Sequence, residues 1–259
     1  MPVFKERTRL LTPTRKLTPS RKLQHNRKLK LVTKGYALSF DGVDDYVEVP
    51  DSPSLRLSRF TITAWFKSST YDSGTIRPFA KKGYSWAWNK FNYAFCVQGV
   101  PLKYILIVGN GTDIFTLDSP RITSDEWHFG AGIYDGHYLI IYHDREEIAR
   151  TTIGAITPYV STDKLLISRS AEAFNGIIAL VCIYNRALNA TEIQWNYEHP
   201  DNPVRGGLVL WLDLTSIEDG VWRDRSGYGN DGVIYGATPV FGYLYYNKTL
   251  DRLEFVRGG

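Results

Sequence analysis

From residue 36 onward, the chain is divided into short runs in which apolar side chains recur at every second position. In the run Phe60–Phe66, four apolar residues alternate with others, which is the period that returns strand side chains to one face. Asp-Gly pairs at 41–42 and 135–136 are typical turn signals between such runs. Aromatic residues make up 14% of the chain and favour pleated surfaces. The pattern predicts an all-β protein built as a two-sheet antiparallel sandwich.

The individual elements follow from the same pattern. Strands are expected at 38–40, 46–49, 60–66, 104–108, 114–117, 127–134, 138–143, 165–168 and 177–184. One short helix is expected as well, because Asn189 suits an N-cap and Glu192 follows three residues later, as in a capping box. This helix should run to about Tyr197, before Pro200.

Charge separates the first 34 residues from the rest. They hold eleven of the 31 Lys and Arg residues and one acid, so they carry +10 while the remainder carries −6. A basic segment on an acidic body suits nucleic acid, an anionic surface or the body of another copy of the chain. A solvated, disordered tail is the alternative that composition alone allows.

The basic segment also contains a six-residue repeat. The units 8–13, 14–19, 20–25 and 26–31 each place Arg second and Leu fourth. Six is a multiple of the strand and polyproline periods but not of 3.6, so the pattern favours an extended arm over residues 1–35. We expect the arm to lie along a repeating or elongated surface and to serve assembly through Arg9, Leu11, Arg15, Leu17, Arg21, Leu23, Arg27 and Leu29.

The segment after the arm resembles a known family. Leu38–Pro50 and Phe60–Phe66 resemble the opening strands of laminin-G-like jelly rolls of the concanavalin superfamily, and Trp127–Asp144 resembles their central hairpin. Phe174–Ile193 resembles the closing strand and helix. The resemblance covers about residues 36–198 and implies a concanavalin/laminin-G-like jelly roll, a fold that serves lectins, adhesins, accessory modules and virion proteins alike.

Two features depart from the family. A segment like 207–232 normally precedes the first matching strand, whereas here it follows the helix. Residues 206–259 therefore complete the sandwich of the same chain, within one domain over 36–259, or the sandwich of a neighbouring copy. The second departure is that 178–182 is apolar on both faces, as if another layer covered it. Cys96 and Cys182 are expected to be buried free thiols, although one disulfide is possible.

Catalytic patterns are missing from the sequence. Hydrolases on this scaffold need two carboxylates spaced along one strand, and no such pair occurs; Asp144–Glu147 is interpreted as a solvated turn. Nucleophile elbows and phosphate-binding glycine loops are missing too, and the five histidines lack metal-ligand spacing with cysteine. We therefore expect a protein that is not an enzyme.

The sequence offers two groups of candidate binding residues. Tyr84, Trp86 and Trp88 alternate along one run, and three aromatic rings on one strand face suit sugar stacking or core packing. No cofactor is expected. Calcium is possible at Asp41, Asp44 and Asp45, but these residues also suit a tight hairpin without metal.

Three functional hypotheses follow. Residues 1–6 lack the apolar segment of a secretory signal, and no run is long enough to span a membrane. The first hypothesis is a structural protein of a virion or similar particle, a coat, decoration or spike subunit. Its arm would assemble it in the cytoplasm with its own copies or with other particle proteins. The alternative is a carbohydrate-binding attachment module that recognises cell-surface glycan. The third is a nucleic-acid-associated protein that uses the arm.

Overall fold

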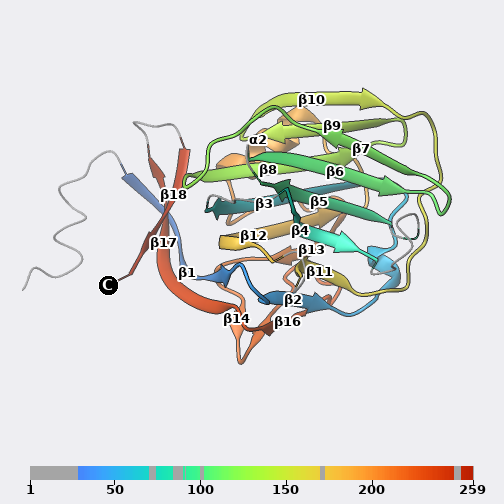
Figure 1. Ribbon diagram of the computed structural model, residues 1–259. Coiled ribbons are helices and arrows are strands. Elements are labelled where there is room, and N and C mark those ends of the chain that lie inside the picture. The colour runs from blue at the N-terminus through green and yellow to red at the C-terminus, as the bar shows by residue number, and fades with distance from the viewer. Residues whose placement is uncertain are drawn as a thin grey trace, which may run out of the picture.

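A computed structural model describes residues 29–69, 74–83, 90, 92–99, 102–169, 173–247 and 252–258. Its strands form two antiparallel sheets, stacked face to face, with nine described strands each (Figure 1). Sheet A consists of β1 (Leu29–Asp41), β3 (Phe60–Ser68), β8 (Trp127–Tyr134), β9 (Tyr138–His143), β10 (Glu146–Thr152), β12 (Asn175–Tyr184), β13 (Leu208–Leu212), β17 (Thr238–Asn247) and β18 (Arg252–Arg257). Sheet B consists of β2 (Tyr46–Val49), β4 (Ile76–Lys82), β5 (Tyr93–Gln98), β6 (Lys103–Gly109), β7 (Ile114–Asp118), β11 (Leu165–Ser168), β14 (Ile217–Glu218), β15 (Val221–Trp222) and β16 (Gly232–Tyr235). The predicted sandwich is confirmed.

The two helical elements lie in connections between strands. A 3-10 turn, η1 (Pro53–Leu55), follows β2, and α2 (Ala190–Glu198) follows β12. Asn189 caps α2 by accepting the backbone N–H of Glu192 at 3.0 Å, and the Glu192 side chain accepts the N–H of Asn189 in return. The predicted capping box is therefore present. Among the described residues, no helix has the length and apolar character needed to cross a bilayer.

The main core lies between the sheets. Alternation along the strands directs one face of each sheet inward, and large side chains such as Phe60, Phe66, Phe79 and Tyr104 fill the space. Gly130 and Gly132 of β8 make room for rings of sheet B, because a Cβ at Gly130 would lie 2.7 Å from the Tyr104 ring and one at Gly132 would lie 2.6 Å from the Phe95 ring. The family-like strands thus build one continuous core.

A second apolar cluster covers the opposite face of sheet A. It contains the outward residues of β12, including Leu180 and Cys182, packed with Ile193 and Tyr197 of α2. The Tyr197 ring lies 5.1 Å from that of Trp65 on β3. The two-sided apolar character of 178–182 is explained by this layer of the chain's own residues. Both cysteines are buried and free, as predicted.

The C-terminal segment pairs within the chain. Strand β13 pairs with β12 from Val181 to Tyr184, beside the place where β1 pairs with β12 from Leu38 to Asp41. Strand β16 pairs with β2 in sheet B. In this structure β13 and β16 of the C-terminal segment thus add to the two sheets of their own chain.

Strands β1, β17 and β18 form a ribbon that extends from one side of the sandwich (Figure 1). Strand β1 begins at Leu29 and runs without a break to Asp41, so the predicted boundary between arm and domain at residue 35 falls inside a strand. Position 35 of this strand requires a glycine, because an added Cβ would be 1.9 Å from the carbonyl oxygen of Leu214. The close approach also allows Tyr36 N–H to donate to that oxygen at 2.6 Å.

Candidate functional site

The outer face of sheet B carries a compact group of polar and aromatic side chains around β2. Val47 and Val49 of β2 are buried in the core, so Tyr46 and Glu48 point to the opposite face. Antiparallel pairing with β16 places Tyr235 opposite Tyr46. The same face of three strands, β16, β2 and β11, therefore forms the floor of the site.

Tyr46 and Tyr235 form a stacked pair. Their ring centroids are 4.7 Å apart and their planes differ by 13°. Tyr235 remains 41% exposed, so part of the pair is accessible to solvent. The turn beside it depends on Gly236, because a Cβ there would lie 2.1 Å from Oδ1 of Asp45.

A cleft of about 460 Å³ opens next to this pair. It is lined by Tyr46, Glu48, Thr162, Asp163, Lys164, Leu166 and Arg169. Two of these residues are acidic and two are basic, so the lining has no net charge. Lys164 Nζ lies 2.6 Å from Oε1 of Glu48, and this contact raises the pKa of Lys164. The volume falls within the range of small-molecule sites, ~300–1,000 Å³.

The loop 162–164 forms one wall of the cleft, and hydrogen bonds from Lys82 and Ser161 fix its position. Lys82 of β4 is buried, and its Nζ donates to the backbone carbonyl of Asp163 and to Oδ1 of Asp51. The Asp163 N–H and side chain both bond to Ser161 Oγ at 3.1 Å. Hydrogen bonds from Arg56 and Lys82 lower the pKa of Asp51 to about 2. The wall is thus fixed by an ionised network.

The acidic turn predicted as a calcium candidate lies between β1 and β2, immediately before Tyr46. Asp41, Asp44 and Asp45 each place a carboxylate oxygen within 4.8 Å of the others. Asp45 accepts the N–H of Asp41, and Asp41 accepts the N–H of Val43, both at 2.8 Å. Desolvation and the neighbouring carboxylates raise the pKa of Asp45. These bonds are those of a turn shaped by its own side chains, and calcium here stays a prediction.

The other predicted site residues lie, with the exception of Leu29, outside the part of the chain that the structure describes. Tyr84, Trp86 and Trp88 lie outside the described residues, as does the arm from Arg9 to Arg27. Leu29 is described as the first residue of β1, where it pairs with Asn247. The Asp144–Glu147 cluster is only in part a turn, because Glu146 and Glu147 already belong to β10.

Sequence reasoning missed the cleft because its parts are distant in sequence. Tyr46 and Glu48 could have been recognised from the alternation of β2, which places both on the face opposite the core valines. No signal in the sequence links them to Lys164 or to Tyr235. Only the pairing of β2 with β11 on one side and β16 on the other brings these residues together.

Comparison with known proteins supports the fold. The family model described as the concanavalin A-like lectin/glucanases superfamily matches residues 41–194. No curated protein sequence matches the chain.

Many solved structures resemble the chain, and two of them show how far the likeness extends. A provisionally assigned carbohydrate binding protein from Bacteroides ovatus superposes with a TM-score of 0.61 at 17% identity, covering 82% of this chain and 60% of its own. This chain thus spans less than two thirds of the Bacteroides protein. A heptameric SAP-like pentraxin from Limulus polyphemus superposes with a TM-score of 0.53 at 12% identity, covering 79% of this chain and 94% of its own.

Proposed function

Because this chain belongs to the concanavalin A-like lectin/glucanases superfamily, we propose that it is a non-catalytic carbohydrate-binding protein whose ligand occupies the cleft on sheet B. The observation that carries the proposal is the stacked pair of Tyr46 and Tyr235 at the edge of a cleft whose acidic and basic side chains balance. The Bacteroides protein, with its provisional assignment to carbohydrate binding, adds support at the level of the fold.

The aromatic pair suits one face of a sugar ring. Pyranose rings have apolar C–H faces, and the exposed part of a tyrosine ring offers such a face an apolar contact. Stacking against Tyr235 restricts the ring of Tyr46, so little conformational entropy is lost when a ligand covers it. The pair is therefore preorganised to bind a ligand with an apolar face.

The charged lining suits neutral hydroxyl groups. A sugar hydroxyl both donates and accepts, so it pairs with a carboxylate such as Glu48 and with an ammonium such as Lys164. Because the acidic and basic side chains of the lining balance, the cleft does not favour an anionic or a cationic ligand. We therefore expect neutral hexose or pentose units to bind in preference to acidic sugars.

A glycan array with the full-length chain tests the proposal, followed by calorimetric titration of the best ligand. Tyr235→Ala and Lys164→Met should each weaken binding roughly tenfold, which corresponds to ~1.4 kcal/mol. Tyr138→Ala on β9 is the matched control, since Tyr138 is about as exposed as Tyr235 but lies on sheet A. Absence of any glycan ligand, or wild-type affinity in both cleft variants, would refute the proposal.

The virion hypothesis has less support. Neither the family match nor the two structures described above points to a virus particle. The segment on which that hypothesis depends, the hexad-repeat arm, lies almost entirely outside the described residues. Particle assembly and nucleic-acid contact by the arm remain predictions from the sequence. Carbohydrate binding is the function that we favour.

A further inference from the structure

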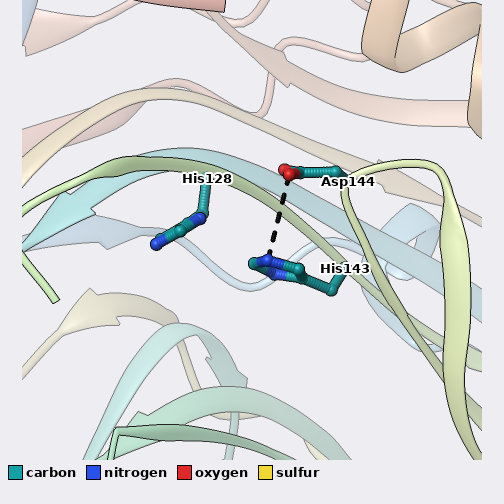
Figure 2. Close-up of side chains that lie close together, drawn as sticks. All are labelled: His128, His143 and Asp144. Atoms are coloured by element: carbon teal, nitrogen blue, oxygen red, sulfur yellow. Dashed lines mark ion pairs between the residues drawn. The ribbon is translucent and has the colours of Figure 1, made fainter. Parts of the chain in front are cut away.

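A second group of side chains, remote in sequence from the cleft residues, gathers where β8 and β9 meet the turn after β9. His128 of β8, His143 at the end of β9 and Asp144 in the turn face one another (Figure 2). The imidazole centroids of the two histidines are 4.8 Å apart, and His143 Nε2 lies 3.8 Å from Oδ2 of Asp144. One ligand atom from each of the three residues lies within 4.8 Å of the others.

The hydrogen bonds of His128 orient its ring. Nε2 of His128 lies 3.0 Å from the backbone carbonyl oxygen of Thr123 and 3.0 Å from its Oγ1. A carbonyl oxygen only accepts, so Nε2 carries the proton of the neutral ring and Nδ1 keeps its lone pair. A histidine whose outer N–H is held by a backbone carbonyl is in the state that metal-binding histidines adopt.

His143 is oriented by Tyr104. The hydroxyl of Tyr104 lies 3.0 Å from Nδ1 of His143, which leaves Nε2 on the side of Asp144. Tyr104 is fully buried and stacks on Phe95 at 5.4 Å, so its hydroxyl is a fixed anchor. Both imidazoles therefore have one nitrogen engaged by a supporting residue and the other directed to the cluster.

Asp144 is fixed by its backbone and by one of its oxygens. Its N–H donates to the carbonyl of Phe129 at 2.7 Å, and its Oδ1 accepts the N–H of Phe129 at 3.0 Å. The residue adopts a left-handed φ of 54°, which the turn requires. These contacts leave Oδ2 available on the His143 side.

We propose that His128 Nδ1, His143 Nε2 and Asp144 Oδ2 bind a zinc ion, with the fourth position open to solvent. Two imidazoles and a carboxylate are a typical ligand set for Zn²⁺, at ~2.0–2.2 Å from each atom. The ligand atoms must draw somewhat closer together than they lie here. His143 and Asp144 have side chains that are 25% and 33% exposed, so they have room to move and the ion has an entrance, whereas His128 is buried and anchors the site.

Titration of Zn²⁺ into the full-length metal-free chain, with calorimetry and thermal unfolding as readouts, tests the site. The wild type should bind one ion at this site and unfold at a higher temperature with zinc. His143→Gln should weaken this binding by roughly 100-fold or more, beyond the range of ~10–100-fold that supporting residues contribute. Asp144→Asn keeps the turn, since asparagine tolerates a left-handed φ, and should weaken binding as well.

Two further variants sharpen the test. Tyr104→Phe keeps the buried ring and removes only the hydroxyl that orients His143, so it should weaken zinc binding ~10–100-fold without unfolding the protein. His137→Gln removes an exposed histidine at the β8–β9 turn and should leave binding unchanged. Wild-type zinc affinity in both His143→Gln and Asp144→Asn, or no zinc-dependent shift in the wild type, would overturn the proposal. In that outcome His143 and Asp144 form an ion pair only.

Discussion

Nζ of Lys82 lies 2.5 Å from Oδ1 of Asp51, and the lysine side chain has no solvent exposure. Desolvation lowers the pKa of Lys82 although the carboxylate opposes this shift. Asp51 is 19% exposed and also binds Arg56, with Nη2 to Oδ2 at 2.5 Å. The buried ammonium thus depends on a carboxylate at the surface, and it holds the carbonyl of Asp163 behind the cleft.

Removing the carboxylate should destabilise the fold. Asp51→Asn leaves the Lys82 ammonium buried without its counter-ion, and the free energy of unfolding should fall by ~3–5 kcal/mol. Adding Lys82→Met in the same chain removes the uncompensated charge and should recover much of the loss. Chemical denaturation checks both variants. Asp118→Asn, which breaks an exposed pair with Lys103, is the control and should change stability by at most ~1 kcal/mol. Equal losses at Asp51 and Asp118 would contradict the prediction.

Protonation of Asp51 should also make the stability of the fold depend on pH. The pKa of Asp51 is about 2 in the folded chain and 3.8 ordinarily, with its hydrogen bond from Arg56 as the first cause. Its contribution is therefore complete above about pH 5 and is lost as the pH falls toward 2. The difference corresponds to ~2 kcal/mol. Urea unfolding between pH 5 and 2 should show a steeper loss in the wild type than in Asp51→Asn. Parallel curves would show that Asp51 is not the group responsible.

The capping box of α2 gives an independent prediction. Asn189→Ala removes the acceptor for the Glu192 N–H and should lower the free energy of unfolding by ~1 kcal/mol. The loss also affects the second apolar cluster, because α2 covers it with Ile193 and Tyr197. Gln194→Ala, at an exposed position of the same helix, is the control and should change stability little. Thermal unfolding followed by near-UV circular dichroism measures both effects.

Local patterns explain why some of the fold was predictable. Strands β2, β8, β9 and β11 begin and end at the predicted residues, because each has clear alternation or an apolar run between turn residues. Strand β17 was missed because it contains Pro239 and Gly242 and owes its conformation to pairing with β1 along its whole length. Strand β18 in turn depends on β17. The partner of β17 lies ~200 positions earlier in the chain, so the local propensity of residues 238–247 does not reveal this pairing.

The candidate sites were less predictable than the fold. Tyr235 joins Tyr46 only through the pairing of β16 with β2. His128 and His143 are 15 residues apart, a spacing outside the usual short ligand motifs, and the β8–β9 hairpin brings them together at its open end. Contacts of this kind depend on how two strands are aligned with each other, which the alternation within each strand does not show by itself.

The arm is best tested with a truncation chosen from the structure. A chain starting at Tyr36 would lose the half of β1 that pairs with Gly242–Asn247, and this would expose an edge of β17 to non-native pairing. A chain starting at Leu29 keeps β1 intact while it removes three hexads and nine of the eleven Lys and Arg residues of the arm.

We expect residues 29–259 to unfold at the same temperature as the full chain and to remain monomeric. The full chain, with its basic arm and acidic body, should self-associate at low salt and dissociate as salt screens these charges. Light scattering between roughly 50 and 500 mM salt measures this difference, because the Debye length shortens several-fold over that range. A full chain that is monomeric throughout would remove the assembly role of Arg9–Leu29. Glycan binding by the shorter chain would then place carbohydrate recognition in the sandwich alone.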